Sequence, residues 1–98
     1  MSSSGTATRT VPDEVLDQHD ARDVPYHVLL WNDPVTLMDI VVRALVKVFG
    51  YPAATAERLM LTAHREGKAV VWTGEREQAT RFCVELGLRG LQSTIARA

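Results

Sequence analysis

The strongest constraint on the fold is a pair of segments with helical periodicity, each followed by a glycine. Apolar residues recur every three or four positions over residues 37–49, and Gly50 follows directly. The same spacing returns over residues 52–66, where Pro52 suits the first turn and Gly67 follows the last. This period buries one face of a helix, and glycine is the commonest residue just past a helix C-terminus. The pattern therefore predicts two consecutive helices.

Short runs rich in β-branched and aromatic residues lie on either side of these helices. Residues 26–31 and 69–73 predict two strands, and the first run stops at an Asn-Asp-Pro turn signal. Residues 75–86 predict a third helix, and the alternating residues 91–95 predict a third strand. The order β-α-α-β-α-β favours a three-stranded sheet covered on one face by helices.

The start of the chain has a different composition. Residues 1–23 hold five acidic and two basic residues, with several Ser and Thr and few apolar side chains. Such a segment has little to bury and is typical of a mobile tail, although a merely solubilising tail would look the same. We expect an N-terminal extension over residues 1–24 and a single domain over residues 25–98. The charge is segregated, with net −3 on residues 1–23 and net +2 on residues 24–98.

The composition of the whole chain excludes several classes of protein. A net charge of −1 provides no positive field for nucleic acid or an anionic membrane. The single cysteine, Cys83, can form neither an internal disulfide nor a cysteine-based metal site. No apolar run approaches the roughly 18 residues of a membrane span. We expect a cytoplasmic monomer with no cofactor, no metal, and no nucleic-acid or membrane partner.

Polar residues gather where the first strand gives way to the first helix. Asn32, Asp33 and Pro34 are turn formers, and Thr36 is placed to cap the helix, with Asp39 three residues later. Turn and cap formation alone would explain this cluster. Alternatively, the acceptor oxygens of Asn32 and Asp33 hold a cationic ligand.

A second candidate site lies near the end of the second helix. His64 follows Met60 by one turn and adjoins Ala63, as an ordinary core histidine would. The same residues could instead form an apolar pocket with a titratable lip, in which Met38 and Met60 would be adaptable walls. Asp33 and His64 could act as an acid-base pair. No nucleophile or phosphate-binding motif accompanies them, so a binding module is favoured over an enzyme.

Two ungapped segments of this chain resemble the ClpS family. They are residues 28–38 (VLLWNDPVTLM) and residues 59–71 (LMLTAHREGKAVV), and the likeness extends over residues 26–95. The Trp-x-Asp-Pro-Val variant resembles the actinobacterial form. The resemblance implies an α+β domain in which a three-stranded antiparallel sheet packs against three helices.

The resemblance also implies a function. ClpS proteins are non-enzymatic adaptors that bind N-degron substrates whose first residue is Leu, Phe, Tyr or Trp. They deliver these substrates to a Clp AAA+ unfoldase of the ClpA or ClpC type, through its N-terminal domain, for degradation by ClpP. The N-terminal extension would then be engaged by the unfoldase pore.

Site residues follow from the same resemblance. Asn32, Asp33 and neutral His64 would accept hydrogen bonds from the α-amino group of the substrate, which is largely cationic at neutral pH. The first side chain would enter an apolar pocket made by Leu30, Thr36, Met38, Val41, Met60, Ala63 and Leu91. Met38 would be the gate that excludes β-branched side chains.

This chain departs from the commoner family pattern at three places. Pro34 replaces a second Asp, Ala63 replaces a Val, and the segment 87–90 before Leu91 is shorter. Two other functions stay open. One is a regulatory module of the unfoldase without N-degron binding, and the other is a small hydrolase that uses Asp33 and His64.

Overall fold

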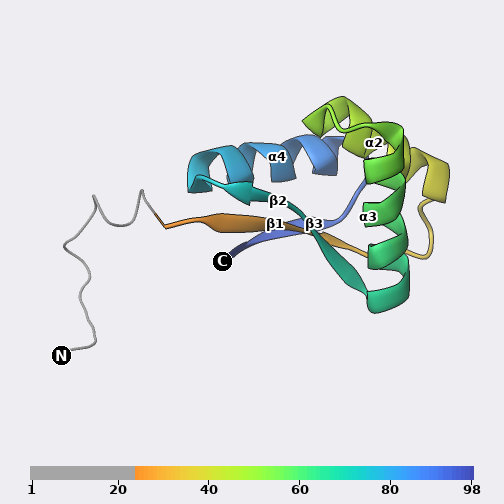
Figure 1. Ribbon diagram of the computed structural model, residues 1–98, viewed down its shortest axis with the longest axis horizontal. Coiled ribbons are helices and arrows are strands. Elements are labelled where there is room, and N and C mark those ends of the chain that lie inside the picture. Colours follow the sequence, from red (N-terminus) through yellow and green to blue (C-terminus); the bar gives the residue numbers. More distant parts are fainter. Residues whose placement is uncertain (1–23) are drawn as a thin grey trace.

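The computed structural model describes residues 24–98. In chain order these form β1 (Tyr26–Trp31), α2 (Met38–Phe49), α3 (Ala53–Glu66), β2 (Lys68–Gly74), α4 (Arg76–Leu88) and β3 (Ser93–Arg97). The predicted order β-α-α-β-α-β is confirmed, and with it the α+β class (Figure 1). The predicted extension over residues 1–24 lies outside the described residues, apart from its last position.

The sheet is antiparallel, and β1 lies at its centre in the order β2-β1-β3. The pairing of β1 with β2 shifts register, since Val28 pairs with Trp72 whereas Leu29 pairs with Val70. The extra residue is Val71, and such a bulge interrupts the alternation of side chains along a strand. As a result both Val71, which is 2 % exposed, and Trp72 belong to the core side of the sheet.

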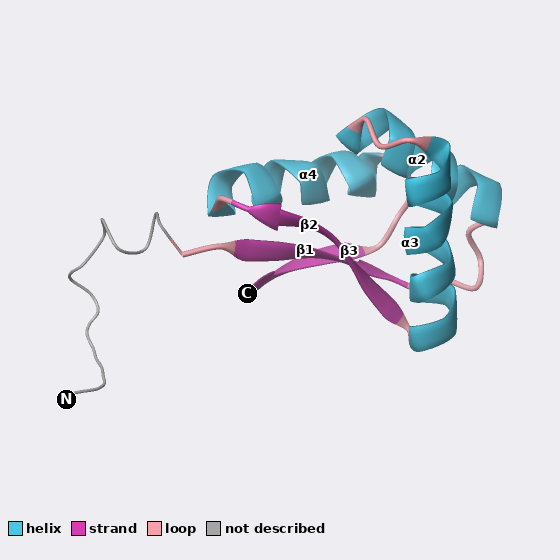
Figure 2. Ribbon diagram, viewed as in Figure 1, coloured by secondary structure: helices cyan, strands magenta, loops and turns pink. Residues whose placement is uncertain are grey.

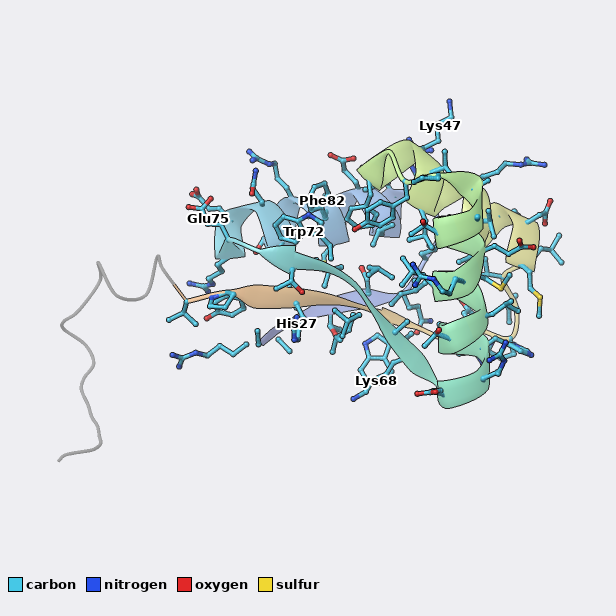
Figure 3. The ribbon with its side chains drawn as sticks, viewed as in Figure 1. His27, Lys47, Lys68, Trp72, Glu75 and Phe82 are labelled. Atoms are coloured by element: carbon cyan, nitrogen blue, oxygen red, sulfur yellow. The ribbon has the colours of Figure 1, made fainter. Side chains whose placement is uncertain are left out.

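The helices gather on one side of the sheet (Figure 2). Their apolar faces and the strands share one core, whose largest fully buried side chains are Leu30, Leu45, Leu86 and Val28. Figure 3 places His27 and Lys68 on the opposite side of the sheet from Trp72 and Phe82. The helices found in residues 24–98 are all too short or too polar to cross a membrane.

Both predicted helix stops are confirmed. Gly50 and Gly67 have φ angles of 74° and 91°, and their N–H groups donate to the carbonyls of Val46 and Ala63. The left-handed conformation costs a side chain roughly 1–2 kcal/mol, which explains glycine at both positions.

The predicted helix cap at Thr36 is wrong. The N-cap of α2 is Leu37, and no side chain caps this helix. The Thr36 hydroxyl instead donates to Asp33 Oδ2 at 3.1 Å. A capping side chain accepts a hydrogen bond from an N–H of the first turn, and it does so from the N-cap position. Because α2 begins at Met38, the N-cap position falls on Leu37, and Thr36 lies one residue before it.

The third strand lies two residues further along the chain than predicted. Gly90 takes a φ of 88°, and the N–H of Leu91 donates to the carbonyl of Leu86 at 3.0 Å. Leu91 therefore closes the end of α4, which runs two residues past its predicted end, and β3 starts only at Ser93. The other element boundaries agree with the predictions within one residue.

Candidate functional site

A cavity of about 330 Å³ lies where the end of β1 meets the loop to α2, the last turns of α3 and the segment before β3. The ten residues named by the sequence analysis all line it. They are the three polar residues Asn32, Asp33 and His64 and the seven pocket residues Leu30, Thr36, Met38, Val41, Met60, Ala63 and Leu91. Residues up to 61 positions apart in the chain are thus brought to one place.

The inner wall of the cavity is apolar and buried. Leu30, Met60, Ala63 and Leu91 are each no more than 7 % exposed. Met60 and Ala63 lie on the buried face of α3, whereas Leu30 lies on the core side of β1. Because neighbouring elements already hold these side chains, the wall is formed before any ligand enters.

The carboxylate of Asp33 organises the loop between β1 and α2. Its Oδ1 accepts a hydrogen bond from the backbone N–H of Val35 at 2.9 Å, and its Oδ2 accepts one from the Thr36 hydroxyl. A carboxylate offers about four acceptor positions. One position on each oxygen therefore stays available to a ligand.

Asn32 is tied to the end of α3 through its backbone. Its N–H donates to the carbonyl of Gly67 at 2.9 Å, which holds the strand end against the turn that follows His64. The side chains of Asn32 and His64 are both exposed and make no hydrogen bond to another described residue. The lip of the cavity thus carries an amide, an imidazole and a carboxylate with unused acceptor capacity.

Four further residues line the cavity that the sequence analysis did not assign to it: Trp31, Pro34, Leu37 and Gln92. The indole Nε1 of Trp31 donates to Thr94 Oγ1 at 2.9 Å, and the Lys68 ammonium lies 5.4 Å from the centroid of its ring. Trp31, Pro34 and Leu37 lie inside the motif 28–38. Their closeness in sequence to Asn32 and Met38 could have predicted that they line the cavity. Gln92 gave no such signal.

The structure does not join Asp33 and His64 into the acid-base pair that the hydrolase alternative requires. Asp33 bonds to its own loop, and no hydrogen bond joins it to His64 among the described residues. Cys83 is a partly buried residue of α4 that packs on the core and does not line the cavity. Within residues 24–98, no three His, Cys, Asp or Glu side chains lie close enough to hold a metal ion.

Among residues 24–98, the titratable group with a shifted pKa lies away from the cavity. Burial raises the pKa of Tyr51 above its ordinary value, and its hydroxyl donates to the carbonyl of Val71 at 2.6 Å. Its ring stacks on Phe49 with centroids 5.1 Å apart. Tyr51 therefore belongs to the packing between α2 and β2.

Comparisons with known proteins agree on one family. Residues 21–94 match the family model described as "ATP-dependent Clp protease adaptor protein ClpS". The chain is 40 % identical to the ClpS adapter of Rhodococcus opacus over 86 % of this chain and 75 % of that protein. It is 36 % identical to the ClpS adapter of Corynebacterium efficiens, over 100 % and 99 % of the two chains.

A solved structure supports the same assignment. The structure of Agrobacterium tumefaciens ClpS2 bound to L-phenylalaninamide superimposes with a TM-score of 0.74 and 34 % identity, covering 79 % of this chain and all of that one. The chain described above therefore belongs to the ClpS family, the adaptor proteins of the ATP-dependent Clp protease.

Proposed function

We propose that this adaptor binds the N-terminal residue of N-degron substrates in the cavity and delivers these substrates to a Clp unfoldase. One observation carries the proposal. A single cavity combines a buried apolar wall with a polar lip. At this lip Asn32, Asp33 and His64 have hydrogen-bonding capacity that no other described residue uses. A bulky N-terminal residue is the ligand that presents both an apolar side chain and a nearby ammonium group.

The related Agrobacterium structure supports this chemistry. Its ligand, L-phenylalaninamide, has a free α-amino group, a benzyl side chain and an amide in place of the next peptide bond. These are the parts of a polypeptide that begins with Phe. In this chain the ammonium group would be bound by the polar lip, and the benzyl group would lie against Met60, Ala63 and Leu91.

Met38 is proposed as the gate of the pocket. It lies on the first turn of α2, lines the cavity, and is 45 % exposed, so its thioether lies at the mouth rather than in the core. A side chain branched at Cβ is widest where it would pass this residue. We expect Leu, Phe, Tyr and Trp to be accepted and Ile and Val to be rejected.

The remaining parts of the proposal concern the partner and the cellular setting. We propose a monomeric, non-catalytic adaptor that docks on the N-terminal domain of a ClpA-type or ClpC-type unfoldase in the cytoplasm. The acidic, Ser- and Thr-rich composition of residues 1–23 suits an extension that an unfoldase pore can engage. A single cysteine is in keeping with a reducing compartment.

Fluorescence anisotropy with labelled ten-residue peptides tests the proposal. Peptides that start with Leu or Phe should bind, whereas the same peptides with Ile, or with an acetylated N-terminus, should not. Binding that survives acetylation would contradict recognition of the α-amino group. If no free-amine peptide binds below millimolar concentration, the regulatory module without N-degron binding becomes the better description.

A further inference from the structure

Two methionines line the cavity, and they differ in their access to solvent. Met60, on the buried face of α3, is 7 % exposed, whereas Met38, on the first turn of α2, is 45 % exposed. They are the only methionines among residues 24–98. A small molecule dissolved in water therefore reaches the side chain of Met38 far more readily than that of Met60.

The backbone keeps Met38 at the mouth of the cavity. The carbonyl of Leu37, the residue before it, accepts hydrogen bonds from the N–H groups of Ile40 and Val41 at 3.1 and 3.2 Å. These bonds begin α2, and Val41 also lines the cavity. The backbone of Met38 is thus held beside the cavity by the helix. A chemical change in its side chain must alter the cavity, because the helix does not carry the residue away.

A thioether undergoes a reaction that a hydrocarbon side chain does not. The sulfur lone pair attacks one oxygen of a peroxide, an S–O bond forms and the O–O bond breaks. With hydrogen peroxide, the proton on the transferred oxygen passes to the departing oxygen, which leaves as water. The sulfur is oxidised and the peroxide is reduced. The product, methionine sulfoxide, is polar, and sulfoxide reductases convert it back to methionine.

A sulfoxide at Met38 would change what the mouth of the cavity accepts. Met38 and the buried apolar wall line the same cavity, so an apolar ligand side chain that reaches the wall also passes Met38. The sulfoxide oxygen accepts hydrogen bonds from water, and such a ligand would displace this water without offering a donor. A polar group that is buried without a partner costs free energy. Oxidation of Met38 therefore disfavours the apolar ligand.

We propose that Met38 is a modification site, at which oxidation by a peroxide to the sulfoxide lowers the affinity of this adaptor for N-degron substrates and reduction restores it. This inference rests on the proposed function, because it takes the cavity to be the substrate site. It adds that substrate binding depends on the redox state of one side chain. Leucine has nearly the volume of methionine, so apolar bulk alone does not require a sulfur atom at this position.

Peptide mass spectrometry tests the modification itself. The full chain is treated with hydrogen peroxide, and the gain of one oxygen atom is followed separately at Met38 and Met60. We expect Met38 to be oxidised before Met60. A saturating Phe-initiated peptide should slow the oxidation of Met38, because the ligand covers the mouth, whereas its N-acetylated twin should not. Equal oxidation rates of Met38 and Met60 would overturn the proposal.

Fluorescence anisotropy measures the effect on binding. The chain with oxidised Met38 should bind a Phe-initiated peptide about tenfold more weakly, as burial of a polar group without a partner would give. Treatment with the two methionine sulfoxide reductases, one for each epimer of the sulfoxide, should restore the original affinity. Circular dichroism establishes that the oxidised chain is folded.

Two variants assign the effect to one sulfur atom. Met38→Leu keeps the other side chains that peroxide oxidises, Met1, Met60 and Cys83. Its affinity after peroxide treatment should equal its own affinity before treatment. Met60→Leu is the matched control, and it should lose affinity on treatment by the same factor as the parent chain. A loss of affinity in treated Met38→Leu would overturn the proposal, because another residue would then be responsible.

The outcomes separate this inference from the proposed function. If the untreated chain binds the Phe-initiated peptide and oxidation of Met38 leaves its affinity unchanged, the modification site is wrong and N-degron binding stands. If no free-amine peptide binds the untreated chain, the proposed function is wrong, and the effect inferred for Met38 is wrong with it.

Discussion

The backbone N–H of Asn32 donates a hydrogen bond to the carbonyl of Gly67 across a distance of 2.9 Å. This bond joins the end of β1 to the residue that ends α3, and so it sets the spacing between two groups of the cavity lip, Asn32 and His64. The left-handed backbone of Gly67 is therefore a requirement of the site as well as of the helix.

Gly67→Ala should lower both stability and peptide affinity. Beyond its two chain neighbours, no residue has an atom within 4 Å of the added methyl group, so the cost comes from the φ angle of 91°, about 1–2 kcal/mol. Any relaxation of this angle shifts the carbonyl that holds Asn32. Thermal unfolding and anisotropy with a Phe-initiated peptide measure the two effects.

Gly50→Ala is the matched control for this substitution. Gly50 has a φ angle of 74°, has equally free space around it, and ends α2 away from the cavity. We expect a similar loss of stability with unchanged peptide affinity. Equal losses of affinity in both variants would show that Gly67 acts only through global stability.

Asp33 should have two separable roles, because its carboxylate holds the loop and carries a charge. Asp33→Asn can keep the bonds to Val35 and Thr36, since its amide offers one acceptor and one donor, but it loses the charge. Asp33→Ala loses both. We expect Asp33→Asn to weaken binding of a Leu-initiated peptide about tenfold, as loss of a charge-assisted bond would, and Asp33→Ala to weaken it further.

The preference of each variant for Leu over Ile as the first residue of the peptide separates these two roles of Asp33. With the loop intact, Asp33→Asn should still prefer Leu over Ile at the first position, whereas Asp33→Ala should lose part of this preference because Thr36 and Met38 are no longer held. Identical Leu-to-Ile ratios in the two variants would argue against a loop-ordering role for Asp33.

His64 should contribute a hydrogen-bond acceptor to the ammonium group of the ligand. An imidazole nitrogen without a proton accepts a hydrogen bond, and a glutamine side chain also offers an acceptor. His64→Gln should therefore weaken binding of a Phe-initiated peptide only slightly. His64→Ala should weaken it about tenfold, as loss of a hydrogen bond to a charged group would, and fluorescence anisotropy measures both affinities.

His27→Gln is the control for the histidine experiment. His27 bonds through Nδ1 to the hydroxyl of Thr73 at 2.7 Å, on the sheet face opposite the helices (Figure 3). It does not line the cavity, so the peptide affinity of this variant should match that of the parent chain. Equal affinities of the parent chain and His64→Ala would exclude His64 from contact with the amine.

Tyr51 should contribute to stability in a way that is lost at alkaline pH. Burial raises its pKa, so the folded state disfavours ionisation more than the unfolded state does. The contribution of this hydroxyl is fully present below the unfolded pKa, about 10, and is lost as the pH rises through the folded value. Chemical denaturation from pH 7 to pH 11 follows this loss.

Tyr51→Phe should reduce the free energy of unfolding by about 1 kcal/mol at pH 7, through loss of the hydrogen bond to Val71. The difference from the parent chain should shrink toward pH 11. Tyr26→Phe, which keeps the ring that faces Arg76, should cost less at pH 7. A constant difference between parent and Tyr51→Phe across the pH range would contradict the role of burial.

Much of this protein follows from short-range patterns. The helical period before Gly50 and Gly67 and the strand-like run over Tyr26–Trp31 are local properties, and all three elements formed as predicted. The spacing of apolar residues indicates which face of an element is apolar. A glycine after the last helical turn indicates where the backbone needs a left-handed conformation. Neither signal depends on what the element packs against.

Other features depend on which of several partners a group meets in the folded chain. Thr36 was expected to cap α2, but the helix begins one residue later than expected, and the Thr36 hydroxyl bonds to Asp33 in the preceding loop. Leu91 could begin a strand, but it closes α4 behind Gly90. The bulge at Val71 and the hydrogen bond from Asn32 to Gly67 each depend on residues far apart in the chain. The exposure of Leu37 at the cavity mouth likewise depends on how distant elements pack. The sequence by itself thus determined the elements, their order and the motif residues. Only the tertiary structure decided the closure of the cavity and the exposure of Leu37 at its mouth, because both arise from packing between elements that no local pattern encodes.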